Sequence, residues 1–257
     1  MRKLAQVRAV ILGIQGTQYK ITENIQRHFE HAVTGAVKEK DHNNIYPNII
    51  DAYAEYNAQR ISPVKAFSEA LGVSEHSLQR SIYNKLHNNV MGMPVKHIKH
   101  DSKLFKATER LQEGIAFATV TKLSADMAQE FYRVTGLRNI HKRESIFAHE
   151  DVDFANKTST EAYAPALRYL GYEDGDDLSS VLVIGDDKAH LACAREMGAL
   201  TAYIGDKNRS IIHGGDVDFE YQNIKVLFHE LHDAQRKEKA LNQKRPNWCD
   251  TIGFDFS

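Results

Sequence analysis

The second half of the chain alternates short apolar runs with helical segments, and this order constrains the fold more than any other feature. Runs rich in β-branched and small apolar residues indicate buried strands: VRAVIL, IAFATV, SIFAH, VLVI and LTAYI, at residues 7–12, 115–120, 145–149, 181–184 and 200–204. Apolar residues at helical spacing predict helices at residues 125–135, 160–170, 190–197 and 223–231. Strands that alternate with helices predict a parallel, doubly wound, Rossmann-like α/β sheet.

A block without strands separates the first predicted strand from the second. Apolar residues in this block recur at helical spacing, for example Ile25, Phe29 and Val33. We therefore expect an inserted helical cap. The expected divisions are an α/β core at residues 1–19 and 111–231, the cap at residues 20–110, and a polar and aromatic tail at residues 232–257. The tail is interpreted either as a frayed helix with a loose end or as a docking peptide.

Composition narrows the range of partners and compartments. With 33 Lys and Arg against 34 Asp and Glu, the chain has no basic field for non-specific nucleic-acid binding. No stretch approaches the ~20 apolar residues that span a bilayer, and the start of the chain lacks the apolar run of a signal peptide. Cys193 and Cys249 form no disulfide framework, which favours a reducing compartment. We expect a soluble, cytoplasmic protein that binds neither nucleic acid nor membrane.

Candidate functional residues follow the predicted strands at their carboxyl ends, where an open parallel sheet gathers its functional groups. The segment GIQGTQY, residues 13–19, follows the first strand, and Thr121 follows the second. Lys157 precedes a predicted helix, and Asp186 and Asp187 follow the strand VLVI. We expect these four places to converge in one pocket, with the strands VRAVIL and VLVI as neighbours.

The order and spacing of these places resemble the motifs of the haloacid dehalogenase superfamily of phosphohydrolases, over the chain up to its charged tail. In that family an Asp that attacks phosphorus ends the first strand, and an Asp that shuttles a proton follows two residues later. Gly13 and Gln15 occupy these two positions, while Gly16, Thr17 and Tyr19 keep the family frame. Gly13 has no side chain to attack with, and Gln15 exchanges no proton near neutral pH. The resemblance therefore implies degenerate catalytic motifs and no catalytic residue.

The resemblance assigns Thr121 and Lys157 to a remnant of phosphate binding. Thr121 stands where a family Thr or Ser hydrogen-bonds the phosphoryl group, although Lys122 replaces the Asn that usually follows. Lys157 stands where a family Lys neutralises phosphate charge, but both of the family's prolines are missing after it. The alternatives are a Thr that only caps a strand end and a Lys that is a solvated surface residue.

Asp186 and Asp187 correspond to the family's Mg²⁺-binding aspartates. Mg²⁺ requires near-octahedral oxygen coordination, and in the family the first Asp and a distal polar residue contribute to it. Here Gly13 replaces that Asp, and Ala189 and His190 stand at the distal position. We therefore expect no tightly held cofactor and at most weak Mg²⁺ binding.

The helical cap resembles that of the pyrimidine 5′-nucleotidase-like subgroup, through Tyr53, Tyr56 and a loop around Pro94. In active relatives such a cap closes over the core and selects the substrate.

Taken together, these patterns predict a pseudoenzyme with a phosphatase fold, retained to bind a ligand or a protein partner of unknown identity. Loss of the nucleophile and the proton shuttle, with erosion at the other motifs, favours this hypothesis. One alternative is an unorthodox phosphatase that acts on a small phosphate ester such as a nucleotide, with water as the nucleophile. The other is a scaffold that assembles through the cap or the tail, and homo-oligomerisation stays open.

Overall fold

The computed structural model describes residues 2–14, 17–18, 23–58, 63–90, 102–152, 159–205 and 217–243. Its centre is one sheet of six parallel strands in the order β3-β2-β1-β4-β5-β6. The strands are β1 Ala9–Leu12, β2 Ala116–Val120, β3 Ile146–Phe147, β4 Val181–Gly185, β5 Leu200–Ile204 and β6 Phe219–Tyr221. The first strand, β1, lies in the middle of the sheet, β2 and β3 follow on one side of it, and β4, β5 and β6 follow on the other. The predicted doubly wound parallel sheet is confirmed, and so is the pairing of β1 with β4.

The central strands are apolar throughout because both faces of the sheet are covered. Every residue of β1 is buried, which is the pattern of a parallel strand between two helical layers. Successive side chains of a strand point to opposite faces. Val10 and Leu12 accordingly belong to one apolar cluster, and Ala9 and Ile11 belong to the other.

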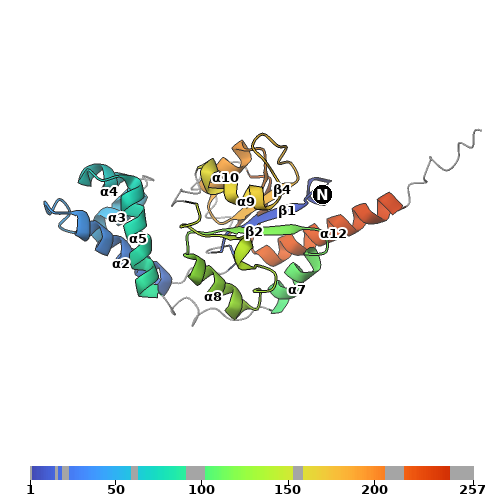
Figure 1. The fold of residues 1–257 in the computed structure, drawn as a ribbon, viewed down its shortest axis with the longest axis horizontal. Coiled ribbons are helices and arrows are strands. Elements are labelled where there is room, and N and C mark those ends of the chain that lie inside the picture. Colours follow the sequence, from blue (N-terminus) through green and yellow to red (C-terminus); the bar gives the residue numbers. More distant parts are fainter. Residues whose placement is uncertain are drawn as a thin grey trace, which may run out of the picture.

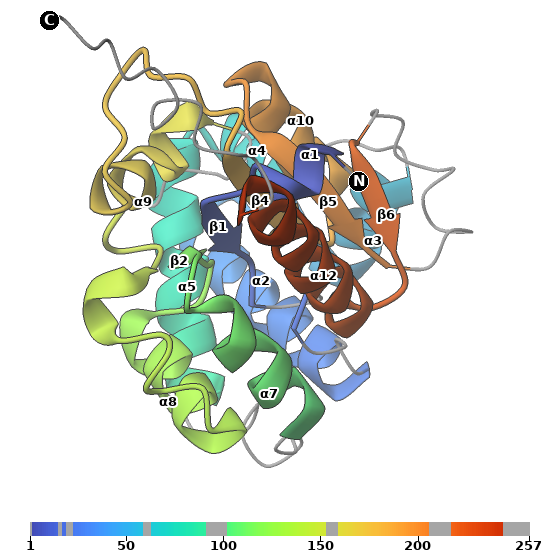
Figure 2. The ribbon, with the colours of Figure 1, turned by 90° about the vertical axis from the view of Figure 1, so that its right-hand side faces the viewer.

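Helices form a layer on each face, as Figures 1 and 2 show. The layer over Ala9 and Ile11 contains α9 Ala164–Tyr169 and α10 Lys188–Glu196. The layer over Val10 and Leu12 contains α7 Ser102–Leu111, α8 Ala125–Thr135 and α12 Ile224–Gln243. Shorter elements are α1 Arg2–Ala5 and the 3-10 turns η1 Arg143–Ser145 and η2 Thr160–Ala162.

Helix α8 has the limits expected from local sequence signals. The Ser124 hydroxyl accepts a hydrogen bond from the backbone N–H of Met127 at 3.3 Å, which satisfies one free donor of the first turn. Gly136 ends the helix in the left-handed conformation, at φ 79°, where glycine lacks the steric penalty of other residues.

The inserted block between β1 and α7 contains the helices α2 Glu23–Lys40, α3 Ile49–Ala58, α4 Pro63–Leu71 and α5 Glu75–Val90. They stand together at one side of the sheet in Figure 1, and we call them the cap. Small residues of α2, among them Ala32 and Ala36, are fully buried there. Phe67 of α4 is also buried, and the rings of Tyr46 and Tyr56 meet its ring edge-on at 4.9 and 5.3 Å.

Three elements differ from the sequence expectation. Helix α12 continues to Gln243, past the expected end at residue 231, because Leu231 and Ala234 are still buried. The segment expected as one helix at residues 160–170 is instead the turn η2 followed by α9, which has Pro165 in its first turn. Strand β6, which the sequence did not predict, is only three residues long, and its Phe219 and Tyr221 pack against the apolar cluster that contains Val10 and Leu12.

Helix α7 lies with the core, packed along α12, whereas the expected division at residue 110 placed most of it in the cap. Its buried face is formed by Leu104, Ala107, Thr108 and Leu111. Within the described residues, no helix combines the length and the apolar character needed to cross a membrane.

Candidate functional site

The end of β1 is held by backbone hydrogen bonds around Gly13. The N–H of Gly13 donates to the carbonyl of Ile184 in β4 at 3.0 Å. The carbonyl of Gly13 accepts from the side-chain amide of Gln18 at 3.1 Å. Residue 13 thus lies at the carboxyl edge of the sheet, between the ends of its neighbour strands, and contributes no side chain. Gln15, Gly16 and Tyr19 lie outside the described residues.

The end of β2 places Thr121 beside that edge. Its N–H donates to the carbonyl of Phe147 in β3 at 3.0 Å, and its hydroxyl accepts from the N–H of Leu123 at 3.1 Å. Thr121 is buried, so its hydroxyl organises the turn that follows the strand. Lys122, the next residue, is half-buried.

The end of β4 brings two carboxylates to the same edge. Asp186 is exposed and Asp187 is half-buried, immediately before α10 begins. The carboxylate of Asp187 lies 3.6 Å from Nε2 of His190. Burial lowers the pKa of the Lys122 ammonium, and the carboxylates of Asp187 and Asp186 oppose this by raising it. The ends of β2 and β4 therefore lie at the same edge of the sheet, on either side of Gly13.

Tyr163 lies six residues after Lys157, where the superfamily motif that begins with this lysine has a Tyr or Phe. Its hydroxyl donates to the carbonyl of His190 at 3.3 Å. Burial raises the pKa of Tyr163, and the neighbouring Cys193 and Asp187 raise it further. The motif predicted an aromatic residue here, whereas its burial and its hydrogen-bond partner are long-range properties that no local pattern shows. Lys157, expected nearby, lies outside the described residues.

A buried polar network extends from the end of β1 into the core, and the sequence did not predict it. The amide of Gln18 donates to the Tyr132 hydroxyl at 3.0 Å, which lies 2.7 Å from the hydroxyl of Thr119. The Thr119 hydroxyl is in turn 3.3 Å from Nδ1 of His141, whose ring stacks on that of Tyr132 at 4.3 Å. Burial lowers the pKa of His141 to about 3. The network connects the Gly13 carbonyl, through Gln18, to a neutral imidazole in the core.

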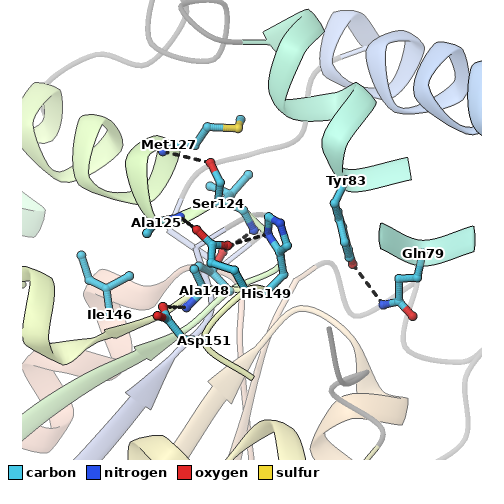
Figure 3. A network of polar contacts seen from close by, with 12 residues as sticks. Gln79, Tyr83, Ser124, Ala125, Met127, Ile146, Ala148, His149 and Asp151 are labelled. Atoms are coloured by element: carbon cyan, nitrogen blue, oxygen red, sulfur yellow. Dashed lines mark hydrogen bonds and ion pairs between the residues drawn. The ribbon is translucent and has the colours of Figure 1, made fainter. Parts of the chain in front are cut away.

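The cap contacts the core close to the end of β2, through the loop that follows β3 (Figure 3). Tyr83 of α5 stacks on the imidazole of His149, and Gln79 donates to the Tyr83 hydroxyl at 3.4 Å. The N–H of His149 donates to the carbonyl of Leu123 at 3.4 Å. The carboxylate of Glu150 accepts from the N–H of Ala125 at 2.6 Å and lies 3.2 Å from Nδ1 of His149. The cap therefore rests on the loop that carries Thr121 and Lys122.

Across the described residues, no group of three or more His, Cys, Asp or Glu side chains is arranged to hold a metal ion. At the carboxyl edge of the sheet, Asp186, Asp187 and His190 carry side chains of types that can bind metals, but they do not form such a group.

Comparison with known proteins identifies the fold. The sequence matches no protein-family model and no curated protein. Its structure aligns with a haloacid dehalogenase-like family hydrolase from Streptococcus pneumoniae at a TM-score of 0.54 and 14% identity, over 88% of this chain and 99% of that one. It also aligns with CbbY from Rhodobacter sphaeroides, solved in complex with phosphate, at a TM-score of 0.55 and 14% identity, over 86% of this chain and 96% of that one. An L-2-haloacid dehalogenase aligns at a TM-score of 0.53 and 15% identity, over 88% of this chain and 98% of that one. The chain has the fold of the haloacid dehalogenase-like hydrolases.

Proposed function

We propose that this protein is a member of the haloacid dehalogenase superfamily that has lost phosphohydrolase activity and uses its pocket to bind a ligand or a protein partner. The observation that carries the proposal is Gly13 at the carboxyl end of β1, between the ends of β2 and β4. The superfamily resemblance puts its nucleophilic aspartate at this position. A glycine there forms no phosphoenzyme intermediate.

The other groups at this edge do not replace the missing aspartate. The hydroxyl of Thr121 is buried and accepts a hydrogen bond from the backbone of Leu123, which ties it to the turn after β2. The N–H and the carbonyl of Gly13 are both used in hydrogen bonds. Gln15 carries no titratable group to serve as the acid or base. Hydrolysis of phosphate esters needs some of the largest rate enhancements known, and we infer that this site does not supply them.

The retained features favour a small anionic ligand. We propose Thr121 and Lys157 as remnants of phosphate binding, with Lys122 as a further cation at the same edge. CbbY, which shares the fold, was solved with phosphate. Backbone amides at a strand-to-helix turn also favour anions. A cap that contains the helices α2, α3, α4 and α5 is in keeping with the resemblance to the pyrimidine 5′-nucleotidase-like subgroup, so nucleotides head the set of ligands to test. We expect the protein to act in the cytoplasm.

A phosphatase assay tests the proposal directly. The purified chain is incubated with Mg²⁺ and a panel of phosphate esters that includes pyrimidine nucleotides. We expect no turnover above background, while inorganic phosphate or a nucleotide shifts the thermal unfolding transition upward. Turnover on the order of 1 per second or faster would identify an active hydrolase instead.

A double variant tests whether the site lacks only the two catalytic aspartates or has also lost other residues needed for catalysis. It also controls for contaminating phosphatases. Gly13→Asp with Gln15→Asp restores the two carboxylates of the superfamily motif. Mg²⁺-dependent activity in this variant, absent from the wild-type protein prepared in parallel, would show that the two substitutions silenced an otherwise competent pocket. A contaminant would give equal activity in both preparations.

A further inference from the structure

We propose that Gln18 is a positioning residue for the turn after β1, which it holds through a one-way chain of hydrogen bonds that ends at Nδ1 of His141 in the core. Each donor in this chain faces away from the turn, and the proton of the neutral His141 imidazole is on Nε2. The importance of the turn for a ligand rests on the proposed function, because its backbone amides are the groups that would face an anion.

The carbonyl of Gly13 sets the direction of the chain. A carbonyl oxygen only accepts hydrogen bonds, so the Gln18 side chain presents its nitrogen to it, at 3.1 Å. The same nitrogen lies 3.0 Å from the hydroxyl oxygen of Tyr132. The side-chain amide therefore donates to both oxygens. Turning this amide over would place its own oxygen against the Gly13 carbonyl, where neither atom can donate.

Tyr132 and Thr119 continue this direction into the core. Because the Tyr132 hydroxyl accepts from Gln18, it donates its own proton to the hydroxyl oxygen of Thr119, 2.7 Å away. Burial raises the pKa of Tyr132, so its hydroxyl keeps that proton. The Thr119 hydroxyl in turn donates to Nδ1 of His141 at 3.3 Å. Nδ1 is therefore the acceptor at the end of the chain.

The end of the chain determines the tautomer of His141. Burial lowers the pKa of His141 to about 3, so its imidazole is neutral near neutral pH and carries one proton. Since Nδ1 accepts from Thr119, that proton is on Nε2, which has no hydrogen-bond partner among the described residues. The opposite tautomer leaves Nε2 equally unpartnered and also leaves the proton of the buried Tyr132 hydroxyl without an acceptor. The Nε2–H tautomer therefore satisfies more of the buried groups.

Gln18 ties the turn to two elements of the core. Its side-chain amide reaches back to the carbonyl of Gly13, and its backbone N–H donates to the carbonyl of Ile14 at 3.0 Å. Tyr132 belongs to α8 and Thr119 belongs to β2, and both residues are buried. The turn is thus ordered before a ligand arrives, which lowers the entropy cost of binding there.

Nuclear magnetic resonance of the wild-type chain tests the direction of the hydrogen bonds. The imidazole nitrogen signals of His141 should show a protonated Nε2 and an unprotonated Nδ1. The hydroxyl proton of Thr119 should show a scalar coupling to Nδ1 across their hydrogen bond. A protonated Nδ1, or a mixture of the two tautomers, would overturn the assignment, and this result requires no variant.

Hydrogen exchange of the Gln18 backbone N–H tests the positioning of the turn. Gln18→Leu and Tyr132→Phe should each accelerate this exchange at least about tenfold relative to the buried amides of β4, which serve as the reference for global opening. The double variant should exchange about as fast as the faster single variant, because both substitutions break the same chain.

Tyr172→Phe is the matched control for the exchange experiment. It also removes a tyrosine hydroxyl, which lies 2.8 Å from Oγ of Ser180, the residue that precedes β4 at the opposite edge of the sheet. This control should leave the exchange of the Gln18 N–H unchanged. Wild-type exchange rates in both single variants, or fully additive effects in the double variant, would overturn the role of Gln18.

Failure of the proposed function gives a different result. If neither inorganic phosphate nor any nucleotide shifted the thermal unfolding transition of the wild-type chain, the role of the pocket in ligand binding would be refuted. The His141 tautomer and the exchange of the Gln18 N–H are measured without a ligand, so they would still decide whether the chain of hydrogen bonds holds the turn.

Discussion

The ring of Tyr83 in the cap stacks on the imidazole of His149 in the core, with centroids 4.6 Å apart and planes at 27° (Figure 3). Both residues are buried. Through its backbone N–H, His149 also holds Leu123, whose own N–H is bonded to the Thr121 hydroxyl. The placement of the cap and the shape of the loop after β2 therefore both depend on His149.

A double-mutant cycle should detect this stacking. Tyr83→Ala and His149→Ala, alone and combined, should show a coupling free energy of unfolding of about 0.5–1.5 kcal/mol, since stacked rings contribute this much beyond burial. Urea denaturation provides the measurement. Tyr83→Phe is the matched control because it keeps the ring and removes the 3.4 Å hydrogen bond from Gln79. Additive effects of the two alanine substitutions would contradict a coupled contact.

His141 should make the protein less stable in mild acid. Its pKa is about 3 in the folded chain and about 6.5 when unfolded, so the unfolded state binds a proton first as pH falls. Stability contributed by the neutral imidazole is present above pH ~6.5 and is lost toward pH ~3, by up to about 1.4 kcal/mol per pH unit. His141→Gln should flatten the fall in urea midpoint between pH 7 and pH 5. The exposed control His31→Gln should leave that slope unchanged, and an equal slope in all three proteins would refute the assignment.

The hydrogen bond between Thr119 and Tyr132 should be a measurable part of core stability. Thr119→Val keeps the shape of the side chain but leaves the buried Tyr132 hydroxyl without its 2.7 Å partner. We expect a loss of about 1–3 kcal/mol in the free energy of unfolding. Adding Tyr132→Phe to Thr119→Val should cost less than the sum of the two single substitutions. If the two losses are independent, the network does not act as a unit.

The ion pair between Lys188 and Glu220 should anchor the edge strand β6. The two charged groups are 2.6 Å apart, and the Lys188 side chain is 10% exposed. Glu220→Gln leaves a largely buried ammonium without its counter-charge, which should lower the free energy of unfolding by about 1–3 kcal/mol.

The exposed pair of Lys65 and Glu69, 3.9 Å apart, provides the matched control for that prediction. Glu69→Gln should change the free energy of unfolding by less than about 0.5 kcal/mol, because water screens charges on an open helix surface. Equal effects of the two glutamine substitutions in thermal or urea denaturation would show that burial of Lys188 adds nothing to its ion pair.

Much of the architecture follows from signals that are local in the sequence. Consecutive apolar residues identified β1, β2, β4 and β5, because a strand covered on both faces needs apolar side chains on both. Ser124 and Gly136 marked the limits of α8, because a cap depends on one side chain and one backbone conformation. The absence of a side chain at Gly13 was likewise visible in the sequence alone.

Only the tertiary structure decided which distant residues meet. Strand β6 is too short to show a strand pattern, and it pairs with β5 where the Asp218 carboxylate accepts two hydrogen bonds from Thr201, at 3.0 and 3.1 Å. The stacking of Tyr83 on His149 and the hydrogen bond from Gln18 to Tyr132 likewise join segments far apart in the chain. Such contacts depend on strand order and on the packing of whole helices. A charged or aromatic residue carries no local pattern that names its partner, because its energy depends on burial and on neighbouring charges that exist only after folding.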